Sequence, residues 1–248
     1  MAGQPPPDGT APAASGRLAK AESALERANT MSNEAFVEEL MRPRNDSGSS
    51  SWPEWTHPRT GQRYGLLVRR AGELSGEQME ACFGLVQATS GNDYRASAGG
   101  WHPAAKRREM ASPALRYVLV VQGEGRVAGF TSMMATFEGG EPVVYCYEIH
   151  LEPALQGTGL GRQLMAHVAR AASAVEPVGK TMLTCFAANG RARRFYEGLG
   201  YRVDATSPRE RRLRGGRVVV PDHVILSRPT TSGAGDGDGD ARQTGPGR

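Results

Sequence analysis

The most informative segment of this chain is the glycine-rich turn Gln156-Gly157-Thr158-Gly159-Leu160-Gly161. The hydrophobic pattern predicts an apolar strand before it, residues 143–151, and an amphipathic helix after it, residues 160–175. Glycines let the backbone approach a ligand closely. The first turn of a helix offers free N–H groups and the positive end of the helix dipole. The stretch therefore predicts an anion site, and its glycines suit a diphosphate.

Two other phosphate-binding motifs are excluded by the residues around this turn. A P-loop requires Gly-Lys-Ser/Thr at the start of the helix, where this chain has Arg162-Gln163. A dinucleotide-binding fold requires an acidic residue at the end of the next strand to hold a ribose. The next predicted strand, residues 181–186, ends at Phe186 and is followed by Ala187-Ala188-Asn189.

The pattern along the chain predicts one mixed α/β domain over residues 61–229. Its central strands are expected to form an antiparallel meander, because glycine turns separate them at Gly123-Glu124-Gly125 and Gly139-Gly140. The expected elements, in order, are strand 64–68, helix 75–86 with Ser75 as its N-cap, strands 115–121, 127–137 and 143–151, helix 160–175, strand 181–186, helix 191–198, and strands near Tyr201 and over 218–226.

The segments outside this domain differ from it in composition. Residues 1–17 and 230–248 contain few residues that could bury a core, so we expect disorder there. Residues 18–42 carry helical periodicity and predict an N-terminal helical extension. Residues 43–60 are expected to be a linker, with Trp52 and Trp55 as possible anchors onto the domain.

The composition narrows the class of protein. No apolar run reaches the roughly 18 residues that a membrane helix needs, so we expect no membrane association. The N-terminus lacks the apolar core of a signal peptide, which predicts a protein of the cytoplasm and nucleus. The three cysteines lie singly in apolar stretches and predict buried free thiols rather than disulfides or a metal site.

The glycine turn resembles the Gln/Arg-x-x-Gly-x-Gly/Ala signature of the GNAT acetyltransferases. Asn189, Phe195-Tyr196-Glu197 and Leu199-Gly200-Tyr201 resemble the second motif of that family, in the right order on the right elements. The resemblance implies the GNAT acyl-CoA N-acyltransferase fold, an α/β (α+β) architecture with a mixed, mostly antiparallel sheet flanked by helices. It also implies acetyl-CoA as co-substrate.

A narrower resemblance, to the N-alpha-acetyltransferase D (NatD) family, is carried by Tyr145-Cys146-Tyr147-Glu148 and by Leu151-Glu152. Further matching residues are Lys106-Arg107, Glu109-Met110, Met182-Leu183-Thr184, Ser207-Pro208 and Ile225-Leu226-Ser227-Arg228. The family acetylates the N-terminal serine of histone tails that begin Ser-Gly-Arg-Gly, so the resemblance implies a protein N-terminus, in particular a histone tail, as partner.

This resemblance also implies roles for individual residues. The cofactor would be held by Ile149, His150, Leu151, Gln156, Gly157, Thr158, Gly159, Leu160, Gly161, Arg162 and Asn189. The peptide groove would be lined by Tyr94, Thr136, Glu138, Tyr147, Thr184, Thr206 and His223. The chain departs from the family at three places: Gly99 replaces a tryptophan, and Thr136 and His223 stand where an acidic residue and a tyrosine would be.

The residues of strand 143–151 can also be interpreted without the resemblance. Alternation predicts Tyr145, Tyr147 and Ile149 on one face of the strand, and Glu148 and His150 on the other. A carboxylate inside an apolar strand is costly unless it is paired or functional. For Glu148 we favour function over a salt bridge to a neighbouring arginine. Tyr147 fits core packing and function equally well, and the side chain of His150 is expected to be structural.

The expected chemistry is direct transfer to an amine. An α-amine has a pKa of about 8, so it needs little help to lose its proton at neutral pH. Glu148, acting through a water, would be an adequate general base. A strand N–H near Ile149 would stabilise the oxyanion. The resemblance implies that Tyr196 occupies the position from which many GNAT enzymes protonate the departing thiolate, a role that is optional because a thiol with a pKa of about 8.5 is already a fair leaving group.

Three alternatives stay open at this stage. The chain could be a GNAT enzyme acting on a lysine or a small-molecule amine, which the shape of the groove would decide. It could be a non-catalytic module on the same scaffold. Residues 209–217, which include Arg209, Arg211, Arg212, Arg214 and Arg217, could make a weak contact with a nucleosome or DNA, although no aromatic residues interleave them. We expect a monomer.

Overall fold

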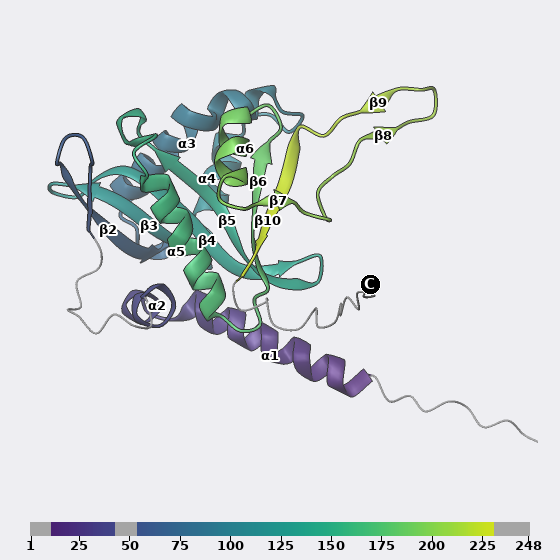
Figure 1. The fold of residues 1–248 in the computed structure, drawn as a ribbon, viewed down its shortest axis with the longest axis horizontal. Coiled ribbons are helices and arrows are strands. Elements are labelled where there is room, and N and C mark those ends of the chain that lie inside the picture. Colours follow the sequence, from purple (N-terminus) through teal and green to yellow (C-terminus); the bar gives the residue numbers. More distant parts are fainter. Residues whose placement is uncertain (1–10, 43–53, 231–248) are drawn as a thin grey trace, which may run out of the picture.

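The computed structural model describes residues 11–42 and 54–230. A twisted sheet forms the centre of the molecule, with helices on both faces (Figure 1). The strands are β1 (Glu54–Thr56), β2 (Arg63–Arg70), β3 (Arg116–Gln122), β4 (Arg126–Glu138), β5 (Glu141–Leu151), β6 (Lys180–Phe186), β7 (Arg202–Val203), β8 (Arg211–Arg212), β9 (Val218–Val219) and β10 (His223–Pro229). The helices are α1 (Ala11–Thr30), α2 (Asn33–Phe36), α3 (Gly76–Ala96), α4 (Pro103–Met110), α5 (Leu160–Ala174) and α6 (Gly190–Glu197), with short turns at Val37–Met41, Ala71–Glu73 and Pro153–Leu155.

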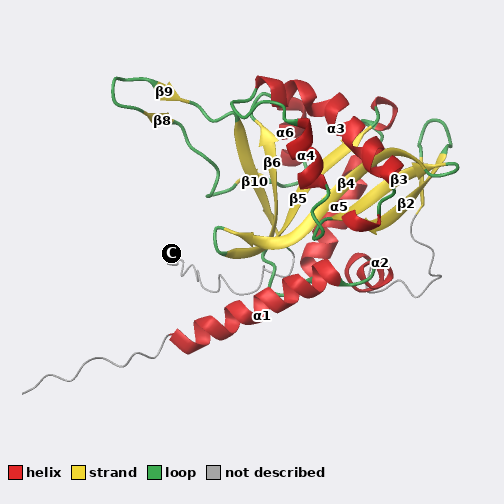
Figure 2. Ribbon diagram, turned by 180° about the vertical axis from the view of Figure 1, so that it is seen from behind, coloured by secondary structure: helices red, strands yellow, loops and turns green. Residues whose placement is uncertain are grey.

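Eight strands form the main sheet in the order β1-β2-β3-β4-β5-β6-β10-β7. Every neighbouring pair is antiparallel except β5 and β6, which run parallel. β8 and β9 pair only with each other and form a separate hairpin (Figure 2). The arrangement is the mixed, mostly antiparallel sheet that the sequence predicts.

The two faces of the sheet carry separate hydrophobic clusters. On one face, Cys82, Phe83 and Val86 of α3 and Met110 of α4 pack against Tyr117 and other residues of the central strands. On the other face, residues of α5 pack together with Phe36, Leu40 and Met41 from the N-terminal helical segment. The three cysteines are buried and free, which confirms that prediction.

The N-terminal helical segment is fixed to the sheet by polar contacts as well as by its apolar side. The Asn29 amide donates to the Ala135 carbonyl at 2.8 Å, and its oxygen accepts from the Ala135 N–H at 3.0 Å. The buried Arg116 donates to the Asn33 side chain and to the Met31 carbonyl. Because a buried cation requires such partners, Arg116 ties this segment to β3.

The predicted elements differ from the structure at several boundaries. Helix 18–41 is interrupted at Ser32, whose hydroxyl caps α2. Residues 11–17, expected to be disordered, belong to α1, and residues 54–56 of the expected linker pair with β2. Trp55 is buried against Tyr64 as an anchor. Trp52, like residues 1–10 and 231–248, lies outside the described residues.

Further differences concern the helices before β3 and the last strands. Ser75 caps α3 through a capping box with Gln78, as predicted, but the helix continues to Ala96. α4 was not predicted. The expected strand 218–226 is divided by Pro221 into β9 and β10, because proline cannot donate to a strand ladder.

A β-bulge in β5 changes which of its side chains point to each face of the sheet. Ser132 pairs with Glu148 and Met133 with Cys146, so Tyr147 has no partner across the strands. Tyr147 packs with the α3 side cluster, and Glu148 and His150 face the same side, whereas Ile149 packs with the α5 side. The predicted common face of Tyr147 and Ile149 is therefore wrong, because an extra residue resets the alternation.

Candidate active site

The site lies where β5 and β6 separate. These strands pair from Val143 with Lys180 to Cys146 with Leu183, and no further. Past Cys146, the edge of β5 that would face β6 has no strand partner, so its backbone groups face an open cavity of about 1240 Å³. Ile149, His150 and Leu151 all line this cavity, together with the glycine turn that follows them.

The glycine turn needs its glycines for two reasons. Gly157 and Gly159 have φ angles of 72° and 93°, in the left-handed region that side chains disfavour. A Cβ added at either position would meet no atom within 4 Å, so their faces are open. Gly159 is the N-cap of α5, which leaves the first N–H groups of that helix free at the cavity.

Two polar side chains of the turn brace it instead of facing a ligand. The Gln156 amide donates to the Leu151 carbonyl at 3.0 Å, and the Thr158 hydroxyl donates to the Leu155 carbonyl at 2.6 Å. Leu160 is fully buried in the core. Thr158 and Leu160 do not line the cavity, so only their backbone N–H groups could serve an anion there.

Two exposed arginines stand at the same end of the cavity. Arg162 is on the first turn of α5 and Arg191 on the first turn of α6. In the described part of the chain, neither side chain has an ion-pair partner. Arg191 was missed by the sequence analysis, although its position two residues after the Asn189 cap was a usable signal. The helix starts and the arginines together make this end suited to phosphate groups.

Asn189 and Tyr196 both line the cavity from α6. The Asn189 side chain accepts from the Ala192 N–H and so caps α6, while its amide donates to Asp93 of α3 at 3.1 Å. Tyr196 is buried, and this burial raises the pKa of its hydroxyl well above the ordinary value. Its hydroxyl therefore keeps its proton at neutral pH.

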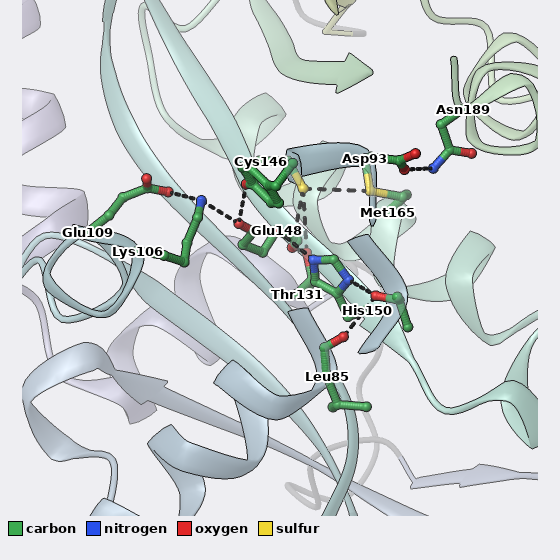
Figure 3. A network of polar contacts seen from close by, with 12 residues as sticks. Leu85, Asp93, Lys106, Glu109, Thr131, Cys146, Glu148, His150, Met165 and Asn189 are labelled. Carbon is green, nitrogen blue, oxygen red and sulfur yellow. Dashed lines mark hydrogen bonds and ion pairs between the residues drawn. The ribbon is translucent and has the colours of Figure 1, made fainter. Parts of the chain in front are cut away.

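Glu148, which also lines the cavity, forms the centre of a buried polar cluster (Figure 3). Its Oε1 accepts from Lys106 Nζ at 2.9 Å and, at 3.5 Å, from the Tyr94 hydroxyl. Its Oε2 contacts His150 Nε2 at 2.5 Å. Lys106 also reaches Glu109, at 2.7 Å, and lies 4.9 Å from the centroid of the Tyr94 ring.

His150 extends this cluster to α3. Its Nδ1 contacts the Thr89 hydroxyl at 2.5 Å, and that hydroxyl also contacts the Leu85 carbonyl (Figure 3). A hydroxyl has one proton, so Thr89 donates to only one of these two acceptors. If Thr89 donates to Leu85, both ring nitrogens of His150 donate and the ring is cationic beside Glu148. If it donates to His150, the ring is neutral.

The charges around Glu148 decide its protonation. Burial by itself would raise the pKa of the carboxyl, but His150 and Lys106 outweigh that effect and lower it to about 2. Glu148 in turn raises the pKa of the Lys106 amine against the opposite effect of burial. Burial, with the nearby Glu148 charge, raises the pKa of Tyr94 to about 12. At neutral pH the cluster therefore holds an ionised Glu148–Lys106 pair.

The predicted substrate-side residues are only partly brought together. Tyr94, Glu138, Tyr147, Thr184 and His223 line the cavity. The Thr184 hydroxyl is 2.5 Å from that of Tyr145, a cavity residue outside the predicted set. Thr136 and Thr206 do not line the cavity, so the predicted direct contact of these two is not supported. Thr136 lies near the C-terminal end of β4, where it pairs with Val143 of β5, and the Thr206 hydroxyl donates to Asp204.

The glycine turn on α5, the separated strands and the ionised Glu148 occur together in one region of the chain. Residues 86–201 match the family model described as the acetyltransferase (GNAT) family. The domain has the GNAT fold. The acetyltransferase from Streptococcus agalactiae superposes with a TM-score of 0.50 at 14% identity, over 66% of this chain and 98% of that structure, which supports the shared GNAT fold.

Among characterised proteins, the N-alpha-acetyltransferase 40 of Saccharomyces cerevisiae is 37% identical to this chain. The match covers 58% of this chain and 60% of the yeast protein, so the chain spans less than two thirds of that relative's length.

Across residues 11–42 and 54–230, no group of three or more His, Cys, Asp and Glu side chains is arranged to hold a metal ion. In those same ranges, no helix combines the length and the apolar character needed to cross a membrane.

Proposed function

We propose that this GNAT domain is an N-alpha-acetyltransferase that moves the acetyl group of acetyl-CoA to the N-terminal amine of a protein. One observation carries the proposal: a single cavity joins the glycine turn of α5 to the Glu148 cluster, at the point where β5 leaves β6. An anion site and an ionised carboxylate therefore line the same cavity.

The residues of the cavity fit acetyl-CoA. The open faces of Gly157 and Gly159 and the start of α5 would bind the pyrophosphate, with Arg162 and Arg191 as additional cations. The unpaired edge of β5 at Ile149 would hold the pantetheine arm and the thioester carbonyl through backbone groups. Tyr196 remains protonated and could donate to the departing thiolate, whose conjugate thiol has a pKa of about 8.5.

Glu148 can still accept a proton or hold one in place. Each carboxylate oxygen has two lone pairs; Oε1 accepts from Lys106 and Tyr94, and Oε2 contacts only His150, so one lone pair of Oε2 is left for a water or an amine. A carboxylate with a low pKa is a weak base, but an α-amine with a pKa near 8 is already partly neutral at pH 7 to 8. Glu148 therefore suits an α-amine better than a lysine amine, whose pKa is about 10.4.

The charges of the cavity support a basic substrate. Glu109, Glu138 and Asp222 line it besides Glu148, whereas Lys106 is already paired with carboxylates. We propose a histone tail beginning Ser-Gly-Arg-Gly as the substrate, so that its arginine would meet the acidic lining. The N-alpha-acetyltransferase 40 name of the yeast relative supports an N-terminal substrate. Action on histones would place the protein in the cytoplasm and nucleus.

The test incubates the full chain and acetyl-CoA with matched peptides and compares the turnover of each peptide. A peptide with a free Ser-Gly-Arg-Gly terminus should be acetylated, and the same peptide with a blocked terminus but intact lysines should be inert. A free Ser-Gly-Glu-Gly peptide, which reverses the charge at one position, should turn over at least ten times more slowly. Comparable turnover of the blocked peptide would instead indicate a lysine acetyltransferase.

A further inference from the structure

The hairpin of β8 and β9 is separate from the main sheet. We name residues 209–220 the arginine arm. Arg211 pairs with Val219 and Arg212 with Val218, and the turn is closed by the Leu213 N–H donating to the Arg217 carbonyl at 2.8 Å. In both ribbon views the hairpin extends clear of the domain, beyond the edge formed by β10 and β7 (Figures 1 and 2). The arm thus adds a projecting surface to the molecule rather than a layer of its core.

The arm concentrates the positive charge of the whole chain. It contains five arginines and one acidic residue, Glu210, which gives it a formal charge of +4. The net charge of the full chain is also +4, so all other residues together are neutral. If the positive charge were a general property of the surface, it would be spread over many elements, whereas here it lies on one short hairpin.

The arginines of the arm are exposed and free to bind. The five arginines, Arg209, Arg211, Arg212, Arg214 and Arg217, are all exposed, and none forms an ion pair or a side-chain hydrogen bond within the described parts of the chain. By contrast, Arg27, Arg63, Arg107 and Arg126 on the domain each pair with a glutamate. The arm also exposes Leu213 and Val220, at 46% and 69%, so it buries little that would stabilise the fold.

We propose that the arginine arm binds the phosphate backbone of double-stranded DNA. Guanidinium groups form paired hydrogen bonds with phosphate oxygens, and a row of them suits a regular line of phosphates. A two-stranded ribbon has dimensions that a double-helical groove admits. Residues 209–220 contain no aromatic side chain, so the base stacking that single strands use is absent from the arm.

The position of the arm relates it to the cavity. Asp222 and His223 follow the arm after Pro221 and line the cavity. A duplex bound to the arm would therefore lie near the cavity and leave its acidic lining to a basic peptide. The binding itself depends only on the arm and is independent of the reaction proposed above.

The test measures binding of the full chain to a fluorescent 20-base-pair duplex by anisotropy over a range of salt concentrations. In one variant all five arm arginines are changed to serine. A smaller variant, Arg211→Ser with Arg212→Ser, has a matched control in Arg59→Ser with Arg108→Ser. The control removes the same charge from two exposed arginines that have no ion-pair partner in the described residues and lie outside the cavity.

We expect the affinity of the unaltered chain for the duplex to fall steeply as the salt concentration rises. In a plot of log K against log salt concentration, the slope of the five-serine variant should be shallower by up to about 4.5. The two-serine variant should bind at least fivefold more weakly, while its control keeps wild-type affinity. Circular dichroism should show both variants folded. Equal losses in the two-serine variant and its control, or an unchanged slope in the five-serine variant, would overturn the proposal. So would tighter binding to poly-glutamate or single-stranded RNA than to the duplex.

Discussion

Lys106 Nζ lies 2.9 Å from Glu148 Oε1, and both side chains are buried. Because lysine and glutamate are rarely buried unless they are paired, each of these two residues depends on the other. The pair places α4 against β5 beside the cavity. It also fixes the charge of the carboxylate that we propose to act on the substrate amine.

We predict that Lys106→Met raises the pKa of Glu148, because it removes a cation that favours the ionised carboxylate. Carbon-detected NMR of the glutamate carboxyls should show the change. Removing one partner of a buried pair should also lower the free energy of unfolding at pH 7 by about 3 kcal/mol. Arg108→Met, on an exposed side chain of the same helix, serves as the control and should change neither quantity. An unchanged Glu148 titration in Lys106→Met would show that His150 alone sets it.

Glu148→Gln should slow turnover by about 100-fold, the usual scale for losing a general base, with acetyl-CoA affinity unchanged. The pKa of Glu148 is lowered to about 2, below the ordinary value of 4.5, so its ionisation stabilises the fold above pH 4.5. That stabilisation is lost as the pH falls from 4.5 toward 2, and it should be missing from the glutamine variant. Turnover assays check the effect on the rate, and acid denaturation checks the effect on stability. Wild-type turnover in the variant would make Glu148 purely structural.

Gly159→Val should abolish acetyl-CoA binding measured by calorimetry. Gly159 has a φ of 93°, which a β-branched residue tolerates poorly, and the added methyl groups would enter the face proposed for the pyrophosphate. Gly125→Val is the matched control, since its φ is 103° and it lies in the turn between β3 and β4, away from the cavity. Gly161→Val should also weaken binding, because Gly161 lines the cavity at the start of α5 and a valine side chain there would enter the space proposed for the pyrophosphate. If Gly159→Val bound acetyl-CoA as tightly as Gly125→Val, the proposed pyrophosphate site would be wrong.

Changing the five arginines of the arm to serine should leave turnover of a short tail peptide unchanged or slightly higher. The arm projects away from the domain, and positive charge near the cavity would only repel a basic peptide (Figure 1). Steady-state kinetics on the free Ser-Gly-Arg-Gly peptide measure this. A variant that stays folded and binds acetyl-CoA, but loses peptide turnover, would show that the arm grips the substrate instead.

The order of elements and the glycine turn could be predicted because they depend on local pattern. Periodicity gave α5 within a residue, and glycines at the helix start predicted an anion site whose geometry the structure supplies. The bulge at Tyr147 could not be predicted, since it depends on how β4 pairs with β5 and not on either strand alone.

The partners of Glu148 also could not be predicted from the sequence. An arginine was the expected structural partner, whereas Lys106 and His150 fill that role. Lys106 lies 42 residues away on a helix that was not predicted. Lys106 is buried on the same side of α4 as Met110, and a buried lysine needs an acidic partner, but this burial is seen only in the structure.

The position of the transferred acetyl group decides whether the chain acts on an α-amine. The full chain is incubated with acetyl-CoA and a peptide that begins Ser-Gly-Arg-Gly and also contains lysine, and the product is fragmented in a mass spectrometer. We expect one acetyl group, on the α-amine of the first serine. Acetyl groups found on lysine side chains, or a peptide left unmodified by a chain that binds acetyl-CoA, would contradict it.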